Sequence, residues 1–158
     1  MTVGLQIHGI TTEIGTGSFF HAFFSTISHH LEPKGWGAVY PLLMHKLYQG
    51  SVEAPDADAL LKELGDVREK LKKFKPSQVI WDIEDLTARP PWGDDISPRI
   101  TDLSNYFVTS TGRDLFEAII ENVEFLKKKG GTLAVVQYKG YPLGPQVRWE
   151  PRSQGAEG

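Results

Sequence analysis

A phenylalanine-rich segment, SFFHAFFSTISHHL at residues 18–31, limits what this chain can fold into. Its large apolar side chains recur at the spacing of one helix face: Phe20, Phe23, Phe24, Ile27 and Leu31. We expect this helix to be the main element of the core. Ser18 stands at its start and is expected to cap it, because a serine hydroxyl can accept a hydrogen bond from a first-turn amide.

The remaining pattern predicts an α+β fold. Apolar residues alternate over residues 3–7, which predicts a strand, and nearby glycines suggest that a second short strand completes a hairpin. Further strands are expected at 78–85, 105–110 and 132–138. Helices are expected after Pro41 as far as Gly50, over 56–74, and from a cap near Thr111 to a stop at Gly130. This order favours a small antiparallel or mixed sheet packed against about four helices.

The length and composition fit a single domain with one core, since the chain has 158 residues, 40% of them hydrophobic. We place this domain at residues 1–138. The Gly- and Pro-rich tail, residues 139–158, is expected to be partly disordered. A net charge of -3 argues against general nucleic-acid binding, which normally needs a basic surface.

Absent features narrow the function classes further. The sequence has no cysteine, which excludes disulfides, thiolate metal sites and cysteine nucleophiles. The first residues lack a secretory signal pattern, and no stretch is apolar enough to span a bilayer, so we expect a cytoplasmic protein that is not bound to membranes.

The sequence VIWDIEDLTARPPWGDDISPRITD at residues 79–102, called the acidic segment below, concentrates charge of one sign. On a strand, Asp82 and Glu84 would project from one face about 7 Å apart, as an acid/base pair or Mg²⁺ site requires. The same charges on an edge strand could instead only discourage unwanted pairing. In this strand Trp81 and Ile83 would anchor the core.

A third interpretation, a surface that binds a basic partner, fits the segment best. Trp92 follows two prolines and stands among aspartates, a composition typical of a recognition loop, although Trp92 could also fold back as a lid on the core. The predicted partner-binding residues are Asp82, Glu84, Asp85, Trp92, Asp94, Asp95 and Asp102.

Other candidate sites have simpler explanations. His21 and His29 lie about 12 Å apart on the predicted helix, too far to share a metal ion, and the chain lacks an HExxH pattern. The GTGS sequence before the helix matches neither a nucleophile elbow nor a phosphate-binding loop. Asp114 after Thr111 fits a capping arrangement. We predict no catalytic residue, metal or cofactor.

Three long segments resemble the immunity protein 70 family of bacterial polymorphic toxin systems: GSFFHAFFSTISHHLEPKGWG, WDIEDLTARPPWGDDIS and TDLSNYFVTSTGRDLF. The resemblance extends to about Val136. It implies a small cytoplasmic protein, encoded beside a toxin, that binds and neutralises the toxin's effector domain and is not an enzyme. It brings no catalytic residues and does not reveal the toxin's chemistry.

From the residues themselves, two other functions stay open at this point. One is a small metal-assisted hydrolase that uses Asp82 and Glu84 with a histidine. The other is a homodimeric scaffold that uses Trp36 or Trp92 at its own interface. For an inhibitor, clustered carboxylates would speed association with a basic toxin, and could occupy the phosphate-binding cleft of a nuclease toxin.

Overall fold

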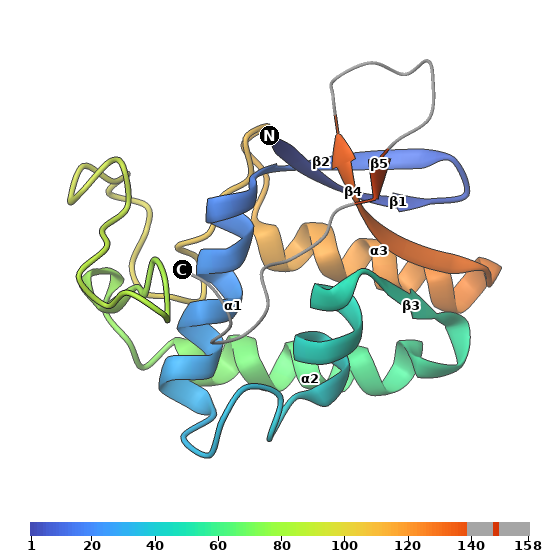
Figure 1. The fold of residues 1–158 in the computed structure, drawn as a ribbon, viewed down its shortest axis with the longest axis horizontal. Helices are drawn as coiled ribbons and strands as arrows, with labels where there is room; N and C mark the ends of the chain where they lie inside the picture. The colour runs from blue at the N-terminus through green and yellow to red at the C-terminus, as the bar shows by residue number, and fades with distance from the viewer. Residues whose placement is uncertain (139–146, 149–158) are drawn as a thin grey trace.

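The computed structural model describes residues 1–138 and 147–148 (Figure 1). Within them the chain forms a five-stranded antiparallel sheet in the order β2-β1-β4-β3, and β5 also pairs with β4. The strands are β1 (Thr2–Ile7), β2 (Ile10–Thr16), β3 (Ser51–Glu53), β4 (Thr132–Tyr138) and β5 (Val147–Arg148). The predicted hairpin and the predicted strand at 132–138 are confirmed.

Helices supply the second layer and confirm the predicted α+β class. α3 contacts β1 and β4 on one side and α2 on the other, so Figure 1 shows it between the sheet and α2. α1 contacts β1, β2 and α2. The helices are α1 (Gly17–Leu31), the π-helix η1 (Leu42–Leu47), α2 (Ala57–Leu71) and α3 (Leu115–Lys129), with short 3-10 turns η2 (Ala54–Asp56) and η3 (Pro76–Gln78).

The domain boundary predicted at residue 138 stays a prediction. Apart from 147–148, the tail predicted at 139–158 lies outside the described residues. No helix in the described part of the chain combines the length and apolar character that crossing a membrane requires.

Two helix caps differ from those predicted. Thr16, not Ser18, caps α1, because its hydroxyl accepts a hydrogen bond from the Phe19 amide at 3.0 Å. Asp114 caps α3 in place of Thr111 by accepting from the Glu117 amide at 2.9 Å. Both caps have extended backbone, the usual geometry for this position. The predicted stop at Gly130 is confirmed.

The core is centred on the aromatic face of α1. The Phe23 ring meets the rings of Phe24, Phe107 and Phe116 edge to face, with centroids 5.0–5.2 Å apart. Phe107 comes from the chain before α3 and Phe116 from α3 itself, so one α1 side chain joins three parts of the molecule. From the sheet, Leu5 and Val135 pair across β1 and β4 and are both fully buried.

A buried carboxylate organises the loop between α1 and η1. Glu32 is 2% exposed and accepts hydrogen bonds from the amides of Gly37, Val39 and Tyr40 at 2.9–3.0 Å. These amides belong to a turn-rich stretch with neither helix nor strand to satisfy them. Glu32 therefore replaces the backbone partners that regular secondary structure would provide.

Tyr40 in this loop is also tied to α2, and the tie is sensitive to alkaline pH. Its hydroxyl donates to Asp66 Oδ2 at 2.5 Å. Burial of the phenol, helped by the hydrogen bond to Asp66, raises the pKa of Tyr40 to about 12. A free tyrosine has a pKa of about 10. The unfolded chain thus loses this proton at a lower pH than the folded chain.

We predict that the stability advantage of the wild type over Tyr40→Phe is constant near neutral pH and declines as pH rises from about 10 to about 12. The sign follows because deprotonation in that window favours the unfolded wild type, whereas the variant has no such proton. Urea unfolding of both proteins at pH 8, 10 and 11 measures the difference. A difference that does not change with pH would contradict the prediction.

Candidate functional site

The acidic segment forms a system of loops beside α1, drawn in yellow-green in Figure 1. The strand predicted at 78–85 is absent, and the strand predicted at 105–110 is reduced to an isolated bridge between Val108 and Asp114. The strand geometry that would set Asp82 and Glu84 side by side is therefore missing. Trp81 nevertheless packs, partly buried, against the core as expected.

Side chains of α1 take the place of a neighbouring strand. Thr26 Oγ1 accepts from the Ile80 amide at 3.1 Å and donates to the Ile80 carbonyl at 3.2 Å. Ser25 Oγ accepts from the Ile83 amide at 3.2 Å, and His30 Nε2 lies 2.7 Å from the Gln78 carbonyl. We call Ser25, Thr26 and His30 the α1 anchor residues. They bind the backbone of the segment and of Gln78, the residue before it.

Asp82 turns inward towards α1. Its Oδ1 lies 3.4 Å from His21 Nε2 and accepts from the Glu84 amide at 2.9 Å. His21 Nδ1 in turn lies 2.7 Å from the Tyr48 hydroxyl. The side chain of Asp82 is 18% exposed, so it contributes to the attachment of the segment more than to its outer surface.

Two of the other predicted site residues shape turns. Asp85 accepts hydrogen bonds from the amide and hydroxyl of Thr87, and Asp102 accepts them from the amide and hydroxyl of Ser104. Burial alone would raise the pKa of Asp102, but the hydrogen bonds from Ser104 and Thr101 outweigh it and hold the pKa below its usual value. Asp102 therefore keeps its charge to a lower pH than a free aspartate does.

Trp92 is half packed and half exposed. Its Nε1 donates to the Tyr106 hydroxyl at 2.9 Å, and its ring stands edge-on to Trp81 with centroids 5.3 Å apart. Yet 38% of the residue remains exposed. One side of Trp92 thus packs against Trp81 and Tyr106, and the other side presents an apolar surface to solvent.

Asp94 and Asp95 follow Trp92 and are exposed. Among the residues that the structure describes, neither carboxylate has an ion-pair partner within 4 Å. Asp94 lies close enough to Tyr106 to add to the effect of burial in raising the pKa of that phenol. Two negative charges therefore stand next to the exposed part of Trp92.

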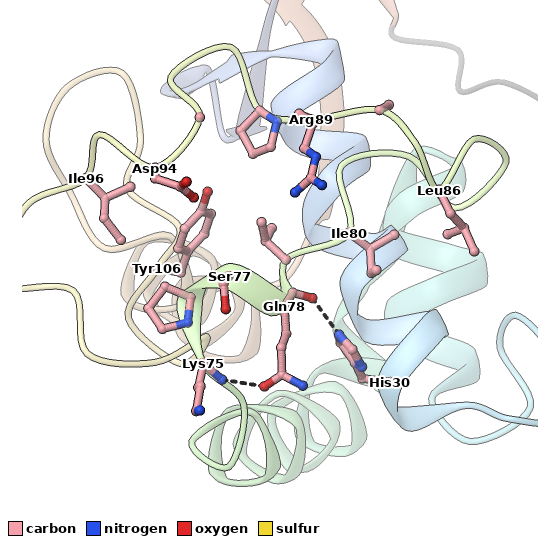
Figure 2. A pocket seen from close by; sticks show the side chains of 15 residues that line it. His30, Lys75, Ser77, Gln78, Ile80, Leu86, Arg89, Asp94, Ile96 and Tyr106 are labelled. Carbon is pink, nitrogen blue, oxygen red and sulfur yellow. Dashed lines mark hydrogen bonds between the residues drawn. The ribbon is translucent and has the colours of Figure 1, made fainter.

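A cavity of about 860 Å³ opens beside these residues (Figure 2). One wall is the chain from Lys75 to Ile80 together with His30. The other wall comes from later residues of the acidic segment, including Arg89 and Asp94. Figure 2 shows the guanidinium of Arg89 directed into the cavity. The acidic segment is thus the wall of a hollow as well as a charged loop.

The geometry gives little support to hydrolysis at this site. His21 does contact Asp82, but it is 5% exposed and packs beside the rings of Trp36 and Tyr48, so a substrate has no access to it. Over the described ranges, 1–138 and 147–148, no three His, Asp or Glu side chains are grouped so that they could hold a metal ion.

In a comparison with family models, the chain matches the family described as immunity protein 70 over residues 5–135. The chain belongs to this family. The matched range includes α1, the acidic segment and every residue that lines the cavity. No curated protein and no solved structure matches the chain.

Membership in the immunity protein 70 family makes the chain an immunity protein of a toxin system. The resemblance found in the sequence is confirmed. The α1 anchor residues and the cavity of this immunity protein were missed from its sequence, although one signal was present. Residues 17–31 contain no Asp, Glu, Lys or Arg, and a helix without a charged face is one that other parts of the chain cover on all sides.

Proposed function

We propose that this immunity protein binds the effector domain of its cognate toxin and blocks it with the outer surface of the acidic segment. The observation that carries the proposal is Trp92, which is 38% exposed, is held by its hydrogen bond to Tyr106, and is followed by the exposed Asp94 and Asp95, of which Asp94 lines the cavity. A rigid aromatic anchor with charges around it is the usual centre of a protein interface.

Within this proposal the seven predicted residues divide by role. Trp92, Asp94 and Asp95 contact the toxin directly, and Glu84 adds to the negative charge. Asp82, Asp85 and Asp102 hold the segment in shape through His21, Thr87 and Ser104. The complement of such a face is a basic surface on the toxin, such as the phosphate-binding cleft of a nuclease. We place the encounter in the cytoplasm of the protected cell.

Charge reversal of the exposed pair tests the proposal. The double variant Asp94→Lys, Asp95→Lys should associate about 10- to 100-fold more slowly with the effector domain of the toxin encoded beside it, and with a weaker salt dependence. The reason is that steering depends on the sign of the charge near the contact. Stopped-flow association at several ionic strengths is the measurement.

The matched control changes the same number of charges elsewhere. Glu69 and Glu124 are exposed on α2 and α3, so Glu69→Lys, Glu124→Lys alters the net charge equally without touching the acidic segment. It should slow association less than about 3-fold, because distant exposed charges are screened. Equal effects of the two double variants would reject the proposed face, and a wild-type chain that leaves the toxin unbound would reject the function.

A further inference from the structure

One residue that lines the cavity, Arg89, carries a positive charge, although the proposed contact surface is acidic. Arg89 is exposed, and its guanidinium points into the cavity (Figure 2). In the described part of the chain it has no carboxylate within 4 Å, so the Asp94 carboxylate on the same wall does not pair with it. An arginine carries a planar set of donors suited to a carboxylate.

The charges around Arg89 favour an anion at this point. The titratable residues that line the cavity are Lys75, Arg89, His30, Asp94 and Tyr106, and burial raises the pKa of the Tyr106 phenol. His30 faces the Gln78 carbonyl, and burial lowers its pKa, so Arg89 is the cation whose charged group Figure 2 shows directed into the cavity. The cavity therefore holds one guanidinium without a carboxylate within 4 Å in the described part of the chain, although the segment around it is acidic.

The apolar residues that line the cavity would strengthen an ion pair formed between Arg89 and a carboxylate inside it. Ile80, Leu86, Pro90 and Ile96 contribute apolar surface to the lining. A carboxylate that enters displaces water from these surfaces and meets Arg89 where solvent screens the interaction less than on an open face. The volume of about 860 Å³ is ample for one amino-acid side chain and its neighbours.

We propose that the cavity receives an acidic side chain, an aspartate or glutamate of the toxin's effector domain, which pairs with Arg89. The inference rests on the proposed function and names the chemistry of one contact within it. Asp94 and Asp95 attract a basic surface, whereas the cavity accepts only a surface that also carries a protruding acid. A basic protein without that acid is attracted but leaves Arg89 unpaired, which makes the contact a source of specificity.

Arginine substitution tests this contact, and the acidic segment supplies a matched control. Arg99 is exposed in the same segment but does not line the cavity. Arg89→Ala should weaken affinity for the effector domain of the neighbouring toxin by about 30-fold, mainly through faster dissociation. Arg89→Lys should recover part of this loss, and Arg99→Ala should change affinity less than about 3-fold. Surface plasmon resonance gives both rate constants.

The outcomes separate the inference from the function on which it rests. Equal affinities of Arg89→Ala and the wild type, with weakened binding by Asp94→Lys, Asp95→Lys, would overturn the inference and leave the function standing. Calorimetry with inorganic phosphate is the second measurement. Phosphate binding that disappears in Arg89→Ala would indicate a small-anion site and would also overturn the inference. The inference would be supported if the Arg89→Glu variant, which binds the wild-type effector domain weakly, bound an effector domain in which one acidic residue is changed to arginine.

Discussion

Replacing Glu32 with alanine is expected to lower the free energy of unfolding by about 4 kcal/mol, because three backbone amides lose their acceptor at once. The amides of Gly37, Val39 and Tyr40 all donate to this carboxylate, and Gly37 and Tyr40 are buried. Water cannot easily replace an acceptor inside the loop. The change also leaves a void where the buried side chain stood.

Urea unfolding monitored by circular dichroism measures this loss. Glu32→Gln keeps one carbonyl oxygen but directs an NH₂ group at amide donors, so it should lose an intermediate amount. Glu124→Ala on the exposed side of α3 is the control and should change stability by less than about 0.5 kcal/mol. A loss below about 1 kcal/mol for Glu32→Ala would show that the carboxylate does not hold the loop.

Phe23→Ala is expected to destabilise the fold by a similar amount, about 4 kcal/mol, for a different reason. The Phe23 side chain is fully buried and contacts the rings of Phe24, Phe107 and Phe116. Removing the ring opens a cavity at the point where α1, α3 and the chain before α3 meet. The rigid partners on three sides allow little collapse into it.

Phe23→Leu provides the comparison, since it keeps most of the volume and should lose only about 1.5 kcal/mol. Both variants are measured by urea unfolding with the slope of the transition checked for two-state behaviour. An alanine variant no less stable than the leucine variant would show that the aromatic cluster relaxes and is not a fixed junction.

Local signals explain which parts of the fold could be predicted. The helix over α2 was predictable because its apolar stripe recurs with helical period and charges fill the other positions. The hairpin followed from alternation in β1 and from the glycines that follow it. β3 was missed because a three-residue strand is too short to show a period.

The acidic segment shows why period alone is insufficient. Val79, Trp81 and Ile83 alternate as in a strand, and Val79 and Trp81 do face the core. A strand also needs a partner strand, however, and here Thr26 and Ser25 occupy that position. No local pattern reports which distant side chain will satisfy a backbone amide.

The candidate site was predictable in composition but not in arrangement. Sequence could identify Trp92, Asp94 and Asp95 as residues suited to recognition, and all three are exposed. It could not indicate that Asp82 turns towards His21, because the contact joins positions 61 residues apart in the chain (82 − 21 = 61). The position of Arg89 in a cavity likewise depends on the tertiary path of the loop.

The α1 anchor residues hold the loop by its backbone amide and carbonyl groups, which do not depend on the side chains of the loop. Thr26 binds the amide and carbonyl groups of Ile80, and Ser25 binds the amide of Ile83, whatever side chains those positions carry. Exposed residues of the loop that make no such packing contacts, such as Asp94 and Asp95, can therefore change at small cost to folding. This attachment separates the residues that stabilise the loop from the residues that it exposes, so the exposed surface can change while the fold is kept.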